Sequence, residues 1–475
     1  MINLLFIFSA LLATIHSGSA LDRPAGGEAV PGPETGDTVI YHDYPTICQR
    51  SDQYRVKING RSTFVYYATV ASFVSFESND TVDVEISVSG RFRNIRILPL
   101  HLGITPEING QTISFRLPSA KKVYVETDLE EQLFIYGNAI ETDKPDPEAP
   151  GVTYFKAGQV YEVGELNLNP GETVYVEGGA VFRGSIRGTR ANNAVIRGPG
   201  VMDGSYYSQQ RRRRVRNLLI EDSRDVTIRD LIMVEPQSWT ITMYHCENIV
   251  VDNVKEISHM GGTDGVDIVS SHGIRVVNSI LRNDDDCIAV KAFTNKYMTY
   301  SDITQNTHLK GVADVLVTGC AIQTNEGGQV FEIGHELMEE PITNIRYVDC
   351  DVLGAHDFGG VFGIHNADGA TISNILYENI RVDHYYNKLI DLRIVKSRFS
   401  GEEKIGRVEH IVFRDISVTA SRFNEGYSIS LIGGYDEDHK IMDVKFENFR
   451  INGVKVTNAD QLDLYMKQAE NVTFQ

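Results

Sequence analysis

The short motif at residues 226–231 (VTIRDL) decides the fold, because versions of it recur along most of the chain. It consists of two apolar residues separated by one variable residue, then a second variable residue, a polar turn residue and a further apolar residue. Other copies stand at residues 249–254, 274–280, 315–317, 345–350, 375–380, 411–416 and 444–449. Their starts are 23 to 41 residues apart, a period typical of stacked repeat architectures.

Each repeat supplies two short strands around a polar turn and contains no helical pattern. One unit cannot bury its own apolar face, so its inward side chains must stack on the next coil. Asn at the turn suits a left-handed backbone, and its amide can hydrogen-bond along the stack. We therefore predict a right-handed parallel β-helix over residues 151–475. A leucine-rich solenoid is the alternative, but its leucine spacing is missing, and a propeller fits poorly because the units are short and irregular.

The segment before the repeats has a different pattern. Strict alternation of apolar and polar residues, typical of half-buried strands, occurs at residues 54–58, 82–88 and 122–126. Asn-Gly pairs such as Asn59-Gly60 are hairpin turn signals. This pattern predicts a β-sandwich over residues 38–142. Residues 143–150 (DKPDPEAP) have little apolar content to bury and are predicted to be a linker.

The first twenty residues contain an apolar run that ends in small residues at Ala20. This pattern is typical of a secretory signal peptide, which predicts a secreted or periplasmic protein. The alternative is an N-terminal membrane anchor, but the apolar run is short for a span of about 20 residues.

The composition limits the classes of function. Hydrophobic residues make up 42% of the 475-residue chain, which is enough for a folded core. The formal net charge of −19 argues against broad nucleic-acid binding, because a phosphate backbone would be repelled.

Five cysteines are too few for a disulfide framework, and four of them lie in apolar strand-like stretches where we expect buried free thiols. Their spacing does not suggest a zinc site, and we predict no metal and no cofactor.

Acidic residues are concentrated in two neighbouring repeats, at residues 261–268 (GGTDGVDI) and 283–291 (NDDDCIAVK). Asp285 follows Asp264 by 21 residues, an offset that places them on adjacent coils about 4.8 Å apart. Carboxylates held this close raise at least one pKa, and a protonated carboxyl beside ionised ones is what acid–base cleavage of a glycoside requires. The alternative is a solvated turn. Asp285 and Asp286 share one side of the chain only if the backbone bends there.

These motifs resemble those of the polygalacturonase-like glycoside hydrolases of family 28 and, more distantly, the dextranase-type family 49. The similarity is clearest over residues 160–380 and includes residues 168–175 (LNPGETVY), 198–204 (GPGVMDG) and 238–241 (SWTI). The family's Asn-Thr-Asp and Asp-Asp-Cys motifs correspond to residues 262–264 (GTD) and 285–287 (DDC).

The resemblance implies a role for each acid. Asp285 would be the general acid, and Asp264 and Asp286 would hold and deprotonate the attacking water, with inversion at the anomeric carbon. Inversion requires the acid and base carboxyls to be about 6.5–9.5 Å apart.

The sequence departs from the family pattern at three places. Gly262 replaces the family's Asn, and the Gly-His-Gly motif is absent near residues 325–328 (NEGG). Residues 363–365 (GIH) stand where the family has Arg-Ile-Lys, while residues 393–396 (RIVK) resemble that motif later in the chain. Losing a bidentate cation site weakens carboxylate recognition. A neutral or sulfated galactan or glucan is therefore as good a candidate substrate as a galacturonan-like polymer.

Five further residues are predicted to bind substrate: Trp239, Lys291, Glu332, His335 and His365. For each there is a structural alternative. Trp239 either stacks on a sugar ring or belongs to the core, Lys291 either faces the site or is a solvated rim lysine, and the two histidines either bind sugar hydroxyls or are structural. Glu332 lies between apolar residues, so its carboxylate needs a partner or a cleft.

Two other segments bear on the substrate and on the mode of action. An arginine-rich run at residues 211–216 either binds an anionic polymer or is a solvated loop, and a loop at residues 292–311 weakly favours exo action.

A polysaccharide lyase would need calcium, held by the aspartates, or a basic residue beside a uronate. A non-catalytic glycan-binding β-helix would not need the aspartates. The predicted partner is a polysaccharide or oligosaccharide, with no nucleic acid and no membrane span.

Overall fold

The computed structural model describes residues 39–208, 215–293, 309–420 and 429–475. The predicted signal peptide, most of the arginine-rich run and most of the loop at residues 292–311 lie outside these residues. Residues 39–475 belong to one compact unit. Among the described residues, no helix has the length and apolar character needed to cross a bilayer.

The first eleven strands form two sheets. One contains, in order, β1 (Val39–Tyr41), β5 (Ala71–Ser78), β11 (Gln132–Asn138), β10 (Lys122–Thr127) and β7 (Ile95–Leu98), with β4 (Tyr66–Ala68) beside β5. The other contains β3 (Arg61–Ser62), β2 (Tyr54–Ile58), β6 (Val82–Val88), β9 (Thr112–Leu117) and β8 (Glu107–Asn109). A short 3-10 helix, η1 (Leu100–Leu102), follows β7.

The two sheets enclose a common core, so these strands form a β-sandwich. Val56 and Ile86 of one sheet and Val74, Val123 and Ile135 of the other belong to one buried cluster. All pairings are antiparallel except that of β5 with β11.

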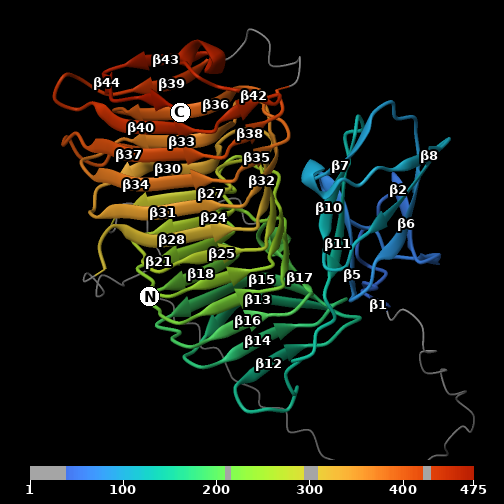
Figure 1. Ribbon diagram of the computed structural model, residues 1–475. Coiled ribbons are helices and arrows are strands. Elements are labelled where there is room, and N and C mark those ends of the chain that lie inside the picture. Colours follow the sequence, from blue (N-terminus) through green and yellow to red (C-terminus); the bar gives the residue numbers. More distant parts are fainter. Residues whose placement is uncertain (1–38, 209–214, 294–308, 421–428) are drawn as a thin grey trace, which may run out of the picture. The chain divides into compact units, whose positions relative to one another are not determined.

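The remaining strands build the right-handed parallel β-helix predicted from the repeats, with successive coils stacked on one another (Figure 1). One sheet runs along the whole stack: β12 (Val152–Phe155), β14 (Thr173–Val176), β16 (Val195–Arg197), β19 (Thr227–Arg229), β22 (Val250–Asp252), β25 (Arg275–Val277), β28 (Val312–Thr318), β31 (Ile342–Val348), β34 (Thr371–Glu378), β37 (Arg407–Arg414), β40 (Ile441–Glu447), β44 (Ala469–Glu470) and β45 (Thr473–Phe474).

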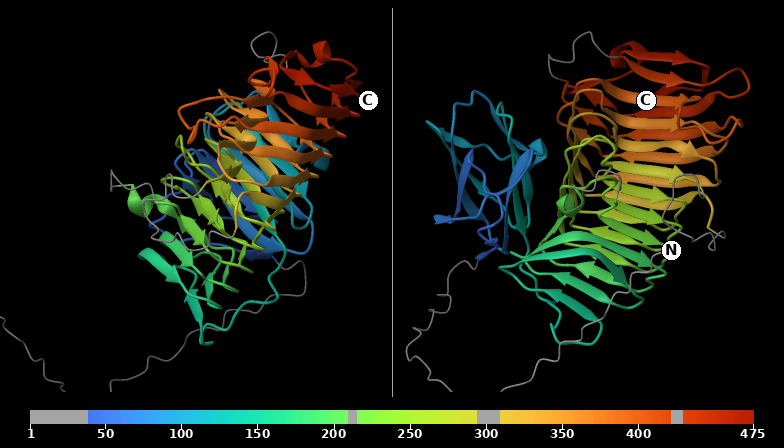
Figure 2. Two further views of the ribbon diagram at one scale, coloured as in Figure 1. Left: turned by 90° about the vertical axis from the view of Figure 1, so that its left-hand side faces the viewer. Right: turned by 180° about the vertical axis from the view of Figure 1, so that it is seen from behind.

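The other sheet has 21 strands and divides into two rows of parallel neighbours (Figure 2). Row A begins with β13 (Val160–Leu168) and β15 (Val181–Thr189) and continues with β17 (Val201–Asp203), β20 (Ile232–Val234), β23 (Lys255–Ile257), β26 (Ile280–Asn283), β29 (Ala321–Thr324), β32 (Asp351–Ala355), β35 (Arg381–Val382), β38 (Ser417–Val418) and β41 (Arg450–Ile451), with β42 (Val454–Lys455) as a hairpin partner.

Row B also starts from β15. It continues with β18 (Leu218–Glu221), β21 (Ile241–Tyr244), β24 (Val266–Val269), β27 (Ile288–Ala292), β30 (Gln329–Leu337), β33 (Gly360–Asn366), β36 (Lys388–Ile394), β39 (Ser430–Gly433) and β43 (Leu464–Lys467). Two 3-10 helices, η2 (Gly204–Tyr207) and η4 (Ala459–Leu462), precede β18 and β43.

The turn before row A has the left-handed backbone expected from its Asn and Asp residues. Asp230, Asn253 and Asn278 have φ values of 71°, 55° and 52°. The side-chain amides also bond along the stack: Asn253 donates to Asp230 at 2.8 Å, and Asn379 donates to Asp349 at 3.0 Å. Both features of the predicted turn ladder are confirmed.

The interior of the coils is apolar and includes a column of stacked rings. Tyr377, Phe413 and Phe446 lie nearly parallel, with ring centroids 4.9 and 5.0 Å apart. Four of the five cysteines are buried free thiols, as predicted. The coil spacing thus lets like side chains stack in register, which one repeat could not achieve alone.

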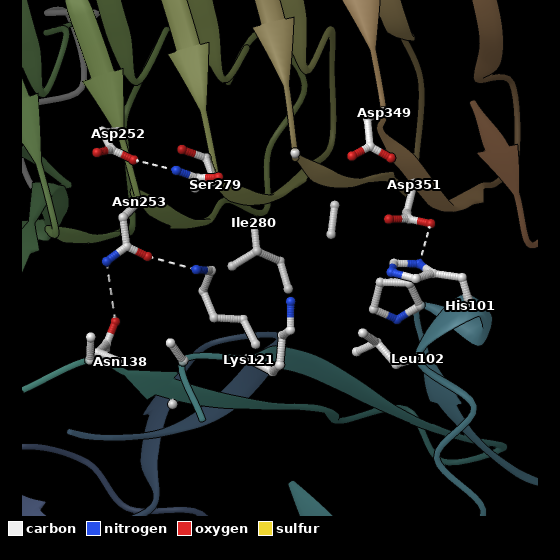
Figure 3. Close-up of a pocket in the computed structure, with 18 of the residues that line it drawn as sticks. His101, Leu102, Lys121, Asn138, Asp252, Asn253, Ser279, Ile280, Asp349 and Asp351 are labelled. Carbon is white, nitrogen blue, oxygen red and sulfur yellow. Dashed lines mark hydrogen bonds and ion pairs between the residues drawn. The ribbon is translucent and has the colours of Figure 1, made fainter. Parts of the chain in front are cut away.

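The sandwich packs its aromatic face on row A. Tyr66, Phe73 and Tyr136 share a buried cluster with Ile232 and Ile257. Elsewhere along the same contact the residues are polar: Lys122 donates to Asn253 at 2.7 Å, and His101 lies 2.8 Å from Asp351, beside a cavity of about 470 Å³ (Figure 3). Because these contacts join the sandwich to the coils within one compact unit, the proposed division at residues 143–150 stays a prediction.

The ring column gives a stability prediction. Phe413 is fully buried between two stacked rings, so Phe413→Ala should leave a cavity and destabilise the protein by about 3–5 kcal/mol. Phe474 ends the column and is partly exposed, so Phe474→Ala should cost clearly less. Thermal and urea denaturation of both variants tests this, and equal losses would contradict it.

Candidate active site

The predicted acids lie in two turns that lead from row A into row B. Asp264 precedes β24, and Asp285 and Asp286 precede β27. Strands β24 and β27 are direct neighbours, so Asp264 and Asp285 lie on adjacent coils as the 21-residue offset predicted. The turns are tied together, because the Gly262 amide donates to a carboxylate oxygen of Asp285 at 2.6 Å and the Gly265 amide donates to the Asp286 carbonyl at 2.8 Å.

The backbone bends at Asp284 and Asp285, which meets the condition for Asp285 and Asp286 to share one side. Both residues are partly exposed, whereas Asp264 is 4% exposed. The Asp286 carboxylate also accepts the Gln329 amide at 2.7 Å.

The environment favours protonated carboxyls in these turns. Burial raises the pKa of Asp285, and the nearby charge of Asp264 raises it further. Burial, followed by the charges of Glu332, Asp264 and Asp285, raises the pKa of Asp286 well above its usual range. The acids therefore interact through space, and the group retains a proton at pH values where an isolated Asp has lost it.

Lys291 is buried rather than on a solvated rim, with 4% of its surface exposed. Its ammonium group donates to Asp264 at 2.7 Å and to Asp267 at 2.6 Å. Burial opposes its charge, but these two acids outweigh the burial and hold the pKa of Lys291 well above its ordinary value. Lys291 thus places a buried positive charge between Asp264 and Asp267 and limits the negative charge of the site.

Trp239 is partly buried beside this cluster. The Lys291 ammonium lies 4.4 Å and the Arg216 guanidinium 4.6 Å from the centre of its ring. Its apolar contacts include Leu219 and Phe293. The ring is therefore engaged by two cations, so its stacking on a sugar stays a prediction.

A second charged cluster lies further along row B. His365 is 2.8 Å from a Glu332 carboxylate oxygen and 3.4 Å from Asp391. Burial lowers the pKa of His365, but the two acids outweigh the burial and raise it to about 9. Burial likewise opposes ionisation of Glu332, yet His365 lowers the pKa of its carboxyl. His365 is thus a cation between two carboxylates.

His335 is stacked on His365 with the ring centroids 4.7 Å apart and the planes nearly parallel. Burial lowers the pKa of His335 to about 4, so this ring is neutral near pH 7. Potential donor atoms of Glu332, His335 and His365 lie within 4.8 Å of one another, a spacing that a metal ion could use. Both ring nitrogens of His365 already have polar neighbours, with Glu332 at Nδ1 and Asp391 and Arg393 at Nε2, so these residues fit a hydrogen-bonded charge cluster better than a metal site.

Three glycines make room for these side chains. A Cβ atom on Gly363 would lie 2.2 Å from a Glu332 carboxylate oxygen, and one on Gly334 would lie 2.4 Å from the other. Gly328 has φ +67° and would place a Cβ 2.3 Å from the Asp286 amide nitrogen. Residues 325–328, which lack the family's Gly-His-Gly motif, therefore press directly on the turn of Asp285 and Asp286.

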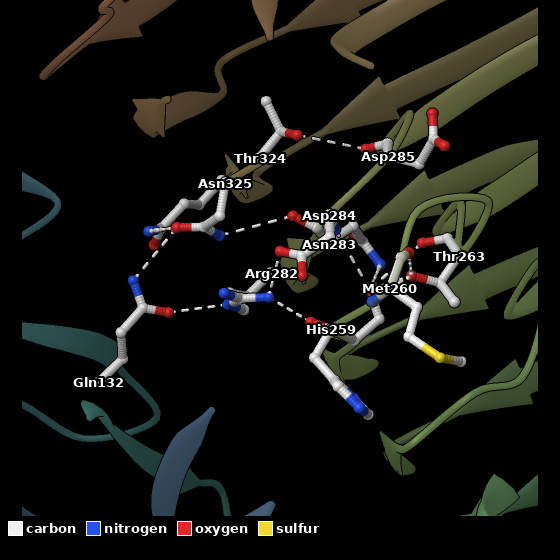
Figure 4. Close-up of polar contacts among 12 residues, drawn as sticks. Gln132, His259, Met260, Thr263, Arg282, Asn283, Asp284, Asp285, Thr324 and Asn325 are labelled. Atoms are coloured by element: carbon white, nitrogen blue, oxygen red, sulfur yellow. Dashed lines mark hydrogen bonds and ion pairs between the residues drawn. The ribbon is translucent and has the colours of Figure 1, made fainter. Parts of the chain in front are cut away.

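A buried polar network supports the same turn from the side of the sandwich (Figure 4). Arg282 is paired with Asp284 at 2.6 Å, and its Nε donates to the Gln132 side-chain oxygen at 2.7 Å. Gln132, at the start of β11, also donates to Asn325 at 3.3 Å. The sandwich thus contacts the polar residues that flank Asp285.

Several charged residues of the site were not among the predicted ones. Asp267 occupies the outward position of β24, and Asp391 and Arg393 occupy outward positions of β36. Asp391 is paired with Arg393 at 2.7 Å and with Lys388 at 3.0 Å. The signal for Asp267 was available: a charged residue alternating with buried Val266 and Ile268 must point away from the core and meet the next coil.

Comparison with known proteins identifies the family. The sequence model of the family described as "Glycosyl hydrolases family 28" matches residues 165–459. The chain belongs to glycosyl hydrolase family 28. The resemblance inferred from the two acidic motifs is thereby confirmed.

Relatives within family 28 are distant. An exopolygalacturonase of Zea mays is 23% identical over 249 residues, which cover 49% of this chain and 56% of the relative. A polygalacturonase of Gossypium hirsutum is 21% identical over 211 residues, which cover 43% and 47%. The chain thus matches about half the length of these relatives.

One solved structure is similar over nearly the whole chain. Dex49A from Penicillium minioluteum aligns with a TM-score of 0.59 and 14% identity, covering 91% of this chain and 96% of that one. At this identity the similarity shows the fold alone.

The close approach of Gly328 to the acidic turn gives a second prediction. Gly328→Ala adds a Cβ against the Asp286 amide and imposes a positive φ on a residue that disfavours it. We expect a loss of stability of about 1–3 kcal/mol and a fall in glycan hydrolysis at temperatures where the variant is folded. Gly261→Ala is the control, because a Cβ on Gly261 would meet no atom within 4 Å. Equal behaviour of the two variants would contradict the prediction.

The charge of His365 gives a pH prediction. Its folded-state pKa of about 9 is higher than its value of 6.5 in the unfolded chain, so its stabilisation is complete below pH 6.5 and is lost as pH rises through 9. His365→Gln should therefore destabilise the protein most near pH 6. About 3 kcal/mol of the loss in free energy of unfolding should depend on pH and disappear above pH 9. Melting temperatures across this range test it, with His410→Gln, at an exposed histidine, as the control. A difference that grows with pH would refute the assignment.

Proposed function

We propose that this protein hydrolyses α-linked glycosidic bonds in a polysaccharide or oligosaccharide with inversion at the anomeric carbon. One observation carries the proposal: on two adjacent coils, Asp285 and Asp286, whose pKa values are raised, lie beside Asp264, which is hydrogen-bonded to a buried lysine. Membership of glycosyl hydrolase family 28 supports the same reaction class.

The roles of the acids follow the family resemblance, because the pKa values of Asp285 and Asp286 are both raised. Asp285, whose pKa is raised, protonates the glycosidic oxygen as its bond to the anomeric carbon breaks. A water held by Asp264 and Asp286 attacks that carbon from the opposite face and transfers its proton to one of these carboxylates. The Lys291 ammonium group is hydrogen-bonded to Asp264, and its charge favours ionisation of Asp286. The proton balance is restored when the carboxyl that took the proton of the water releases it to solvent and Asp285 takes one up.

The charge pairing around His365 favours a neutral sugar at that position. In the described part of the chain, His365 is bonded to Glu332, while Arg393 and Lys388 are both paired with Asp391. A uronate would have to compete with these buried carboxylates for their cations. The names of the relatives point to galacturonan. We propose a neutral or sulfated galactan or glucan, or a galacturonan-like polymer, as the substrate class.

Secretion is also a proposal. The predicted signal peptide at residues 1–20 and the polysaccharide substrate both support a secreted or periplasmic enzyme.

The decisive variant is Asp285→Asn. It removes the proton donor while keeping the size of the side chain, so we expect activity to fall by about 10²–10⁴-fold without a large change in melting temperature. Asp225→Asn, at an exposed turn, is the matched control and should retain activity. Digestion of a panel of α-linked glycans followed by NMR of the newly formed anomers tests inversion. Normal cleavage by the Asp285 variant, or a retained anomer, would refute the mechanism.

The same digests separate the rival reaction. A lyase would produce an unsaturated sugar that absorbs in the ultraviolet, and a calcium-dependent lyase would lose activity in a chelator. We expect neither result. Failure to cleave any glycan, together with glycan binding that is unchanged by Asp285→Asn, would instead indicate a non-catalytic binding protein.

A further inference from the structure

A second cavity between the sandwich and the coils lies on the same edge of row A as the acidic turns. Its volume is about 620 Å³, within the range of small-molecule sites of about 300–1,000 Å³. Tyr66 and Tyr67 line it from β4, while Arg183, Asp203 and Glu235 line it from the coils. We call it the tyrosine pocket.

Strand register relates the tyrosine pocket to the acidic turns. Asp203 is paired with Val234, Val234 with Ile257, and Ile257 with Arg282, whose strand leads into the turn of Asp285. Three strand spacings of about 4.8 Å make this distance about 14 Å along the stack. A short oligosaccharide bound at Asp285 can therefore extend to the tyrosine pocket.

The tyrosine pocket has the chemistry that binds sugar rings. Tyr67 is half-buried, and its hydroxyl bonds the Thr69 carbonyl, which fixes the ring that flanks the cavity. Aromatic faces pack on the C–H faces of sugars, while carboxylates accept hydrogen bonds from their hydroxyls. Asp203, the last residue of β17, and Glu235, which directly follows β20, supply such acceptors at the same edge of row A.

The charges of the tyrosine pocket select against an anionic ligand. Among the described lining residues the arginine is Arg183, which is already paired with Asp203 at 3.2 Å and with Glu162 and donates to Ser205 at 2.9 Å. Glu235 lies 3.3 Å from His259, a residue of the turn that carries Asp264. In this described lining, three carboxylates face one paired arginine, and a uronate would add a fourth negative charge.

We propose that the tyrosine pocket is a distal subsite that binds neutral, hydroxyl-rich sugar units of the same glycan chain that is cleaved at Asp285. The proposal rests on the proposed glycoside hydrolase function. The subsite is shared between the two parts of the protein, because β4 of the sandwich contributes the aromatic side chains and the coils contribute the acceptors. It makes the enzyme selective for longer chains.

The test compares long and short substrates. Tyr67→Ala and Glu235→Gln should lower kcat/KM for a long glycan by about tenfold while leaving disaccharide or trisaccharide cleavage within about twofold. Tyr67→Phe keeps the ring but loses the hydroxyl that bonds the Thr69 carbonyl, so it should lower kcat/KM for the long glycan less than Tyr67→Ala does. Melting temperatures of all variants identify any that fail to fold, in which case Tyr67→Leu replaces Tyr67→Ala. Equal effects on long and short substrates, or no effect on either, would overturn the proposal.

Binding to the Asp285→Asn protein separates this proposal from the catalytic one. The probes are an isomalto-octasaccharide, as a neutral chain, and an octagalacturonide, as an anionic chain, measured by calorimetry. We expect Glu235→Gln in this background to weaken binding of the neutral chain. If binding weakens but the parent protein cleaves nothing, the subsite stands and the proposed function fails. If the parent protein cleaves glycans but the tyrosine-pocket variants bind and cleave normally, the subsite fails alone. Binding of neither probe, or binding of the neutral chain that Glu235→Gln leaves unchanged, refutes the subsite.

Discussion

Strand register between successive coils is the constraint on which the rest of the structure depends. Backbone hydrogen bonds repeat at about 4.8 Å along the stack, so each residue has a fixed neighbour on the coils before and after it. The same spacing stacks Tyr377 on Phe413 inside the coils and brings Lys291 within hydrogen-bond reach of Asp264 and Asp267 outside them. A one-residue slip would turn the rings outward and the charges into the apolar interior.

Burial makes the charged residues of the site interdependent. An unpaired charge with almost no exposure to water is costly, so each buried acid is balanced by a nearby cation or keeps its proton. Lys291 serves Asp264 and Asp267, while His365 serves Glu332 and Asp391. The pKa values of Asp285 and Asp286, which lead into β27, are raised, as is that of Asp267 despite its contact with Lys291. The proposed proton donor thus belongs to a group of buried acids that outnumber their cations.

The sequence allowed the fold and the acidic turns to be predicted because both depend on local periodicity. Repeated strand patterns with Asn or Asp at the turn predict stacked coils, and the 21-residue offset places Asp264 beside Asp285. The repeat could not reveal the burial of Lys291, since a lysine in a strand is usually solvated. It also could not reveal the contact of Gln132 with Arg282, because 150 residues separate them and no periodic pattern relates the two segments. The domain boundaries and the residue roles stay predictions.

The sandwich is therefore more than a separate module placed before the coils. Its aromatic face covers apolar side chains of row A that would otherwise be exposed to water, which accounts for a stable contact. That contact alone would not require polar groups at its edge. Yet Gln132 bonds Arg282 beside the acidic turn, and Tyr67 lines the tyrosine pocket further along the same edge. Apolar burial fixes the sandwich on row A, and this fixed position allows its edge residues to support the turn and to extend the proposed glycan-binding surface.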